Sequence, residues 1–333
     1  MIVVKNSTDE NIQINVCKTQ IMQNILFKLL FDGEISEVYS IFVSISKLYN
    51  NLQMKLIADS GSTKTLWTLL NNDNSHTQYY TPGINPFFQT EEEIEDHFRL
   101  HLQPQLNVNH FDSIYFYGAG CATPKQTMVV EKAFAQVFHF NTIDVESDLL
   151  GAAKALCGDD AGIACILGTG SNSCYYDGEK ITEQVSPLGY IIGDEGSGAS
   201  LGKRLVADCL KNQVSSAIKE RFLERFNLTQ AHILENIYSK PFPNRFLASL
   251  SIFLKENLQE PEIYRMVYEG FADFFKRNVF QYDYNNSQVH VVGSVGYYYQ
   301  EVLRRVTSDL SVSLGRIIQA PMDGLIAYHA YKN

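Results

Sequence analysis

The sequence has no C-x-x-C pair, no apolar run of bilayer length and no secretory signal. Several of its six cysteines lie within apolar runs, so we interpret them as buried thiols of a reducing compartment. The N-terminus lacks a basic region followed by a cleavable apolar one. We therefore expect a cytoplasmic protein that has no membrane partner.

An excess of positive charge is also missing. The chain has 27 Lys and Arg against 37 Asp and Glu, which gives a net charge of −10 at pH 7. Such a surface repels the phosphates of nucleic acids, so we expect no nucleic-acid partner. A phosphate site in this chain has to rely on backbone amides, a few cations and a metal ion.

The length and composition indicate an ordinary globular protein of more than one domain. The 333 residues are 45% hydrophobic and 19% charged, and a chain of this length suits two domains. Residues 1–53 differ from the rest, with a polar stretch and two segments, 21–31 and 38–48, that suit amphipathic helices. We interpret 1–53 as an N-terminal extension or a misassigned start before Met54; a small packing subdomain is the alternative.

The stretch around which the chain is organised is an apolar run, 164–167, that ends in a turn of small residues, 168–172. Glycines let the backbone approach an anion closely, and the amide dipoles of such a turn can face it. A second copy of the pattern begins at Met54, where a predicted strand leads into the glycine turn 60–63.

The order of elements also occurs twice. Both series predict three strands of a meander followed by alternating helices and strands. The first series has strands at 54–59, 66–70, 77–80, 113–117 and 143–146, and helices from Thr90 (with Glu93 at the capping-box position), at 124–138 and at 149–156. The second has strands at 162–167, 173–176, 181–185, 289–292 and 316–318, helices at about 197–280 broken at 241–243, one after residue 296 and one after Pro321.

This repetition predicts two similar α/β lobes with a ligand in the cleft between them. We place the N-terminal lobe at 54–158 together with the last helix, about 321–333. The C-terminal lobe covers 159–320 and includes a helical insertion at about 197–280.

The first glycine turn offers groups suited to a metal-bound phosphate. Asp59 ends a buried strand and could hold a hydrated Mg²⁺, which prefers carboxylates and water. Ser62, Thr63 and Lys64 could reach phosphate oxygens. A polar hairpin in which Asp59 only caps the turn explains the pattern equally well, and the spacing is not that of a P-loop.

Asp148 opens a predicted helix directly after a strand. A plain N-cap is one interpretation. The other is a base that orients and accepts the proton of an attacking hydroxyl, which the helix N-terminus would keep ionised.

Three further turns are candidate binding sites. The segment 189–198 has four glycines around Asp194 and Glu195, which suits the reading of polyol hydroxyls. Asn85 could also bind polyol hydroxyls, or it could simply form an Asn-Pro turn. The turn at Gly293 and Ser294 could hold a nucleotide base or ribose.

In this order, the motifs resemble those of the BadF/BadG/BcrA/BcrD ATPase family. The resemblance runs from Met54 to the end and is greatest to the N-acetylglucosamine kinases of the actin-like sugar-kinase superfamily. It rests on five segments: 59–65, Asp148 with Gly151, 167–172, 193–197 and 292–295. The segment 320–327 departs from the richer Gly/Ala run of such kinases.

The resemblance implies two ribonuclease-H-like lobes that close on ATP and Mg²⁺ and a transfer of the γ-phosphate to the 6-hydroxyl of an amino sugar. It implies that Asp148 is the catalytic base and that Asp59 binds the metal. The implied ATP and phosphate residues are Gly61, Ser62, Thr63, Lys64, Gly168, Thr169, Gly170, Gly293 and Ser294. The implied sugar-binding residues are Asn85, Gly120, Asp148, Gly189 and Asp194.

Two other functions stay open at this point. Relatives in the same family are ATPases that activate 2-hydroxyacyl-CoA dehydratases through a shared iron–sulfur cluster, for which Cys121 would be a ligand. A non-enzymatic sensor could use the same ATP clamp, since a fold does not fix a function. Dimerisation is common among the relatives of this family, and a homodimer is compatible with either of these two functions.

The interpretation of residues 1–53 predicts that a chain that begins at Met54 folds and keeps its activity. Circular dichroism and an activity assay of this shortened chain test it. Loss of folding or of activity would refute the extension and favour the packing subdomain.

Overall fold

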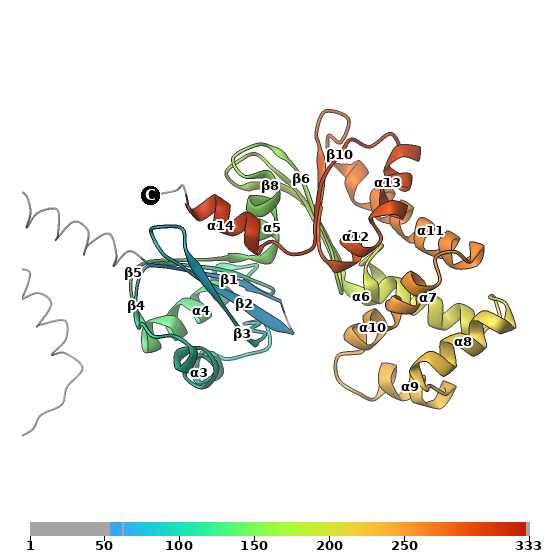
Figure 1. Ribbon diagram of the computed structural model, residues 1–333, viewed down its shortest axis with the longest axis horizontal. Helices are drawn as coiled ribbons and strands as arrows, with labels where there is room; N and C mark the ends of the chain where they lie inside the picture. The colour runs from blue at the N-terminus through green and yellow to red at the C-terminus, as the bar shows by residue number, and fades with distance from the viewer. Residues whose placement is uncertain (1–53, 62, 331–333) are drawn as a thin grey trace, which may run out of the picture. The chain divides into compact units, whose positions relative to one another are not determined.

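The computed structural model describes residues 54–61 and 63–330 (Figure 1). The predicted helices at 21–31 and 38–48, the phosphate residue Ser62 and the last three residues lie outside this range. The contacts divide the chain into two compact units, of which one is Met1–Met54 with Asn71–Asp73 and the other is Lys55–Leu70 with Asn74–Asn333. The second unit contains both of the sheets described below.

The first half of the second unit builds sheet A, with helices on both of its faces. Its strands are β1 (Lys55–Ser60), β2 (Lys64–Leu70), β3 (His76–Pro82), β4 (His110–Gly118) and β5 (His139–Ser147). Its helices are α3 (Glu91–His97), which continues as a π-helical turn at Phe98–Leu102, α4 (Pro124–Val137) and α5 (Asp148–Cys157). The capping box predicted at Thr90 and Glu93 is confirmed, with both reciprocal hydrogen bonds in place.

The second half builds sheet B and a helical insertion. The strands are β6 (Gly162–Leu167), β7 (Ser171–Tyr176), β8 (Ile181–Val185), β9 (Val289–Val292) and β10 (Leu314–Ile318). The loop before the insertion contains α6 (Gly189–Ile192), and the insertion contains α7 (Gly198–Leu210), α8 (Ser216–Phe226), α9 (Gln230–Tyr238), α10 (Pro243–Glu256) and α11 (Pro261–Arg277). The chain ends in α12 (Ser294–Tyr298), α13 (Gln300–Asp309) and α14 (Met322–Ala330).

The two sheets share one topology. Sheet A has the order β3-β2-β1-β4-β5, and sheet B has the order β8-β7-β6-β9-β10. In each, the first strand pairs antiparallel with the second and parallel with the fourth. The predicted fold class, two α/β lobes of ribonuclease-H-like strand order, is confirmed.

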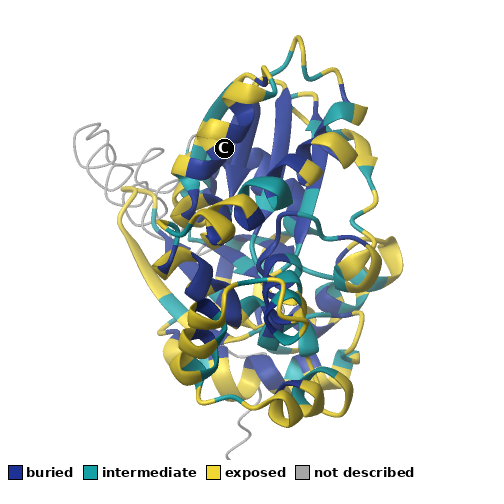
Figure 2. Cartoon of the chain, turned by 90° about the vertical axis from the view of Figure 1, so that its right-hand side faces the viewer, coloured by how far each residue is buried: buried dark blue, intermediate teal, exposed yellow. Residues whose placement is uncertain are grey.

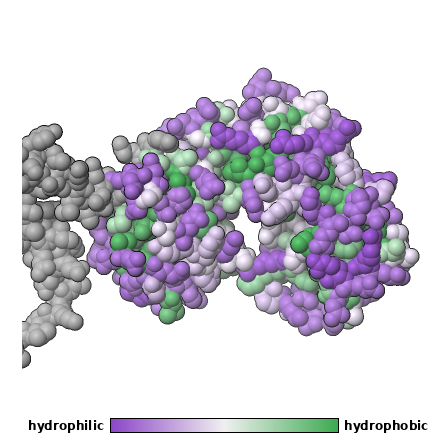
Figure 3. All heavy atoms as spheres, viewed as in Figure 1, coloured by the Kyte–Doolittle hydropathy of each residue, from purple (hydrophilic) through white to green (hydrophobic). Residues whose placement is uncertain are grey.

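The helical insertion is divided into more helices than the sequence predicted. One break was predicted, at 241–243, whereas the structure also interrupts the helices after Leu210, Phe226 and Glu256. The loop 189–198 contains the short helix α6, whose carbonyls at Tyr190 and Ile191 accept hydrogen bonds from Lys203 Nζ. Figure 3 shows mostly hydrophilic side chains over α8, α11 and α13 at the right of the view.

Because successive side chains of a strand point to opposite sides, sheet A has two faces with different side chains. Trp67, Phe98, Phe116 and Phe134 form an aromatic cluster on the face covered by α3 and α4, with Trp67 and Phe134 ring centroids 6.1 Å apart. Adjacent residues point the other way, so Tyr117 packs with α5 and α14. The central strands β1, β6 and β9 are largely buried, whereas the outer strands β3 and β8 are mostly exposed, and Figure 2 shows strands of both kinds.

Helix α5 packs against both sheets. Its residues Leu149, Ala152 and Leu156 join a buried cluster with β6, β7 and β9. Its residue Ala155 joins a second cluster with β1, β4 and α14. The first residue of this helix, Asp148, is therefore positioned by contacts with both halves of the unit.

Gly151 allows α5 to approach β4 closely, because a Cβ atom there would lie 2.7 Å from Cβ and Cγ of Tyr117. We expect Gly151→Val to reduce the free energy of unfolding by about 1–3 kcal/mol, although valine is a better helix former than glycine. Urea denaturation monitored by circular dichroism measures the change. The control is Ala135→Val at an exposed site on α4, and an equal loss in both variants would contradict the close-packing account.

Candidate active site

The carboxyl ends of the parallel strands in sheet A lie side by side. In the strand register, Ser60 of β1 is opposite Gly118 of β4, which is opposite Ser147 of β5. Asp59, the turn at Gly120 and Asp148 are next to these three positions in the chain. The edge of the sheet therefore gathers residues that are up to 89 positions apart in sequence (148 − 59).

Asp59 and Asp148 are close enough to influence each other electrostatically. Burial raises the pKa of Asp59 to about 7, with a further contribution from the Asp148 charge and an opposing one from Lys64. Two carboxylates and one ammonium thus share one end of sheet A. A carboxylate pair of this kind suits a divalent cation, which would favour the ionised form of both.

The N-cap of α5 is Ser147, and Asp148 is the first helical residue. Ser147 Oγ accepts a hydrogen bond of 3.2 Å from the backbone N–H of Leu150. The plain N-cap interpretation of Asp148 is therefore wrong. Burial raises the pKa of the Asp148 carboxyl, while the N–H groups of Leu149 and Asp148 oppose this rise.

Asn85 and Gly120 lie against each other on sheet A. Gly120 has φ +84°, and a Cβ there would come within 2.1 Å of Asn85 Oδ1. The same oxygen accepts a hydrogen bond from the N–H of Phe87, and the carbonyl of Asn85 accepts from Phe88. The Asn-Pro turn is thus present, and the sugar contact of Asn85 stays a prediction.

The β1–β2 hairpin carries the other residues predicted in this lobe. Gly61 donates its N–H to the Lys64 carbonyl, and the Thr63 carbonyl accepts from Gly83. Sequence reasoning missed the structural role of Ser60. Its buried hydroxyl lies 2.7 Å from Thr65 Oγ1 and also bonds to the backbone of Ile84, which ties the hairpin to the Asn85 loop.

On sheet B, the turn 168–170 is held by the start of α7. The N–H of Gly168 donates to the Gly170 carbonyl, and the carbonyls of Gly168 and Thr169 accept from Gly198 and Ala199. These bonds fix the turn that is predicted from the sequence to bind phosphate.

The Gly293–Ser294 turn lies against the same turn, 168–170. Gly293 has φ +124°, and a Cβ there would lie 2.3 Å from the Leu167 carbonyl oxygen. Only glycine allows the backbone at position 293 to come this close to the Leu167 carbonyl, so packing alone explains why this residue is glycine.

Asp194 also belongs to the group on sheet B. Its Oδ1 accepts a hydrogen bond of 3.3 Å from the N–H of Ser171, and a Cβ on Gly170 would lie 3.0 Å from its Oδ2. Burial raises its pKa, and the Ser171 N–H opposes this. Glu195 forms an ion pair with Arg277 at 2.7 Å, a contact that the sequence pattern did not indicate. Gly189 opens α6 and has open space around its Cα.

The structure thus brings the predicted residues together in two groups. Asp59, Lys64, Asn85, Gly120 and Asp148 lie at the end of sheet A, and Gly168, Thr169, Gly170, Asp194 and Gly293 lie at the end of sheet B. Within the described residues, no group of three or more His, Cys, Asp or Glu side chains is arranged to hold a metal ion. A cation at Asp59 and Asp148 would depend on water and phosphate oxygens for its remaining ligands.

Comparison with solved structures gives strong matches. A proposed N-acetylglucosamine kinase of Porphyromonas gingivalis is 46% identical, covers 83% of this chain and 99% of its own, and superposes with a TM-score of 0.79. A second proposed N-acetylglucosamine kinase, of Chromobacterium violaceum, is 19% identical with a TM-score of 0.64 and covers 84% and 99% of the two chains; it shows the fold alone. No family model and no curated protein matches the chain. No helix in the described range is long and apolar enough to cross a membrane.

The raised pKa of Asp59 predicts a pH-dependent stability in metal-free protein. Between its ordinary value of 3.8 and about 7, the native state binds more protons at Asp59 than the unfolded state does, so stability falls as pH rises. We expect Asp59→Asn, which needs no proton, to have a higher Tm than the wild type at pH 8 and a similar Tm near pH 4.

Thermal unfolding in EDTA across this pH range measures the difference. Asp96→Asn, on an exposed part of α3, is the control and should follow the wild type. A difference between Asp59→Asn and the wild type that does not grow as the pH rises would contradict the assignment.

Proposed function

Because this chain belongs to the sugar-kinase branch of the BadF/BadG/BcrA/BcrD ATPase family and is a phosphotransferase, we propose that it transfers the γ-phosphate of ATP to the 6-hydroxyl of N-acetylglucosamine or a related hexosamine. The observation that carries this proposal is the 46% identity, over 83% of the chain, to a protein described as a proposed N-acetylglucosamine kinase. The pair of glycine turns at the ends of equivalent strands supports it further.

The cofactors of this reaction would be ATP and Mg²⁺. The donor set fits them, because the turns at 61–64 and 168–170 offer backbone N–H groups, hydroxyls and one ammonium, and Asp59 offers a carboxylate near Lys64. Mg²⁺ supplies neutralisation of the triphosphate charge. Gly293 and Ser294 would lie at the adenosine, as the resemblance implies.

Asp148 would hold the acceptor hydroxyl and take its proton. The phosphoryl-transfer transition state is loose, so positioning of the alcohol contributes more than strong basicity. Asp148 is suited to this role because Ser147 already caps the helix and because burial raises the pKa of the Asp148 carboxyl, while the amides at the start of α5 oppose this rise. Asn85, Gly120, Gly189 and Asp194 would bind the sugar.

The comparison favours a sugar kinase over the dehydratase activator, because the solved structure that is 46% identical to this chain is described as a proposed N-acetylglucosamine kinase. All five cysteines in the described range are buried. Iron in the purified protein would revive the activator. The cytoplasmic location and the homodimer stay predictions.

We expect Asp148→Asn to lower kcat by about 10²–10⁴-fold, the usual contribution of a general base, while the Kd for ATP stays within twofold. A coupled ADP-release assay and nucleotide titration measure the two quantities. Asp96→Asn should keep wild-type kinetics. Turnover by Asp148→Asn at the wild-type rate would remove the base assignment.

The acceptor is tested with a panel of N-acetylglucosamine, glucosamine, N-acetylmuramic acid and glucose in the same assay. We expect the highest kcat/KM for N-acetylglucosamine, and we expect Asn85→Ala to raise the KM for the sugar more than the KM for ATP. ADP release that does not depend on any sugar would contradict the proposed function.

A further inference from the structure

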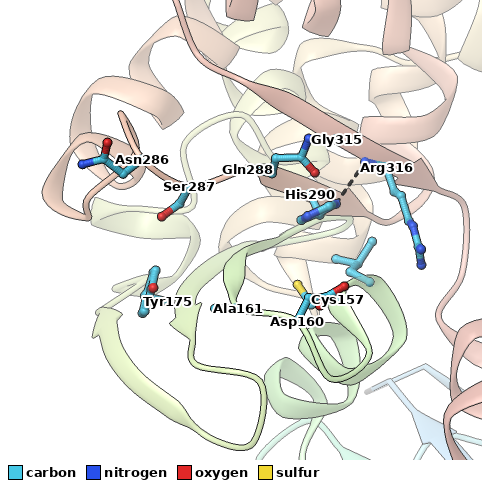
Figure 4. A pocket seen from close by; sticks show the side chains of 11 residues that line it. Cys157, Asp160, Ala161, Tyr175, Asn286, Ser287, Gln288, His290, Gly315 and Arg316 are labelled. Atoms are coloured by element: carbon cyan, nitrogen blue, oxygen red, sulfur yellow. Dashed lines mark hydrogen bonds between the residues drawn. The ribbon is translucent and has the colours of Figure 1, made fainter.

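A pocket of about 430 Å³ lies at the opposite edge of sheet B from the glycine turns (Figure 4). Ala161, Gln288 and Gly315 line it, and these residues stand at the starts of β6, β9 and β10. The turns at 168–170 and 293 follow the other ends of β6 and β9. A six-residue strand spans about 20 Å, so the pocket is separate from the candidate active site.

His290 is built into the wall of this pocket. Only 8% of its surface is exposed, and two glycines on neighbouring strands leave room for its ring. A Cβ on Gly315 would lie 2.5 Å from Nδ1 and Cε1 of the imidazole, and a Cβ on Gly162 would lie 3.3 Å from its Cδ2. The strands are therefore shaped around this side chain.

The hydrogen bonding of His290 makes it a donor toward the pocket. Nδ1 accepts a 3.0 Å hydrogen bond from the backbone N–H of Arg316, so the proton of the neutral ring is on Nε2. Burial and the Arg316 charge lower the pKa of His290 and keep the ring neutral. Among the residues that the structure describes, none forms a hydrogen bond with Nε2, which is directed away from Arg316 in Figure 4.

Two charged side chains line the pocket, Arg316 and Asp160, and both act electrostatically on Cys157. The Arg316 residue is exposed and occurs in none of the ion pairs of the described range. In Figure 4 it lies on the opposite side of the pocket from Asn286, with His290 between them. Asp160 lies near the end of α5 beside Cys157, so an anionic group would be attracted to Arg316 and repelled from Asp160.

The rest of the lining suits hydroxyl groups. Gln288 offers an amide, Ser287 a hydroxyl and Tyr175 a phenol with an aromatic face, while Leu156 supplies an apolar wall. The volume lies in the range of small-molecule sites. Guanidinium groups bind phosphate through paired hydrogen bonds, and amides and hydroxyls read the groups of a polyol.

We propose that this pocket is a second ligand site, which binds a polyol with one anionic group, of the sugar monophosphate class. The phosphate binds Arg316, and the hydroxyls bind His290 Nε2, Ser287 and Gln288. The site does not depend on the proposed catalytic activity, since its ligand class follows from the lining alone.

The test is calorimetric titration of the full chain with N-acetylglucosamine 6-phosphate, with excess N-acetylglucosamine and a non-hydrolysable ATP analogue present to occupy the active site. We expect Arg316→Ala to raise the Kd at least tenfold. Arg304→Ala, which removes an exposed arginine of α13 outside the pocket, should bind as the wild type does. Unchanged Tm values verify that both variants are folded.

The outcomes separate this site from the catalytic proposal. Binding that is lost in Arg316→Ala and kept in Arg304→Ala and Asp148→Asn supports the site, even if the chain phosphorylates no sugar. No binding at millimolar ligand, or equal binding by the Arg316 and Arg304 variants, would overturn it. Inorganic phosphate that binds as tightly as the sugar phosphate would overturn the polyol assignment.

Discussion

The burial of α5 against both sheets is the interaction on which the arrangement of the candidate active site depends. Leu149, Ala152 and Leu156 pack with strands of sheet B, and Ala155 packs with strands of sheet A and with α14. The helix begins at Asp148, beside Asp59, and its last turn lines the pocket that contains His290. One apolar helix therefore fixes the position of the carboxylate that we propose as the general base.

Much of the fold could be predicted because its signals are local. Strand β6 is a short apolar run that is followed by Gly168, and the capping box at Thr90 is readable from four residues. The repeated order of elements also predicted two lobes, since each series begins with the same meander. The finer divisions of the α7–α11 region escaped prediction because loop breaks such as the one after Leu210 carry no proline or glycine pair.

The site was harder to predict, because its contacts join residues that are far apart in the sequence. Asn85 and Gly120 meet only when the turn after β4 folds against the Asn85 loop, and no spacing in the sequence shows this. The sequence could not show whether Ser147 or Asp148 is the N-cap of α5, since both residue types are good N-caps. No feature of the sequence pointed to His290, because the room for its ring depends on Gly162 and Gly315, which are 128 (290 − 162) and 25 (315 − 290) positions away in the sequence.

The most direct test of the account is a structure of the chain with N-acetylglucosamine and an ATP analogue bound together. The account predicts that the Asp148 carboxylate lies within hydrogen-bond distance of the sugar 6-hydroxyl, with the terminal phosphate between the turns at Thr63 and Thr169. A sugar bound away from Asp148, or phosphates that touch neither turn, would contradict it.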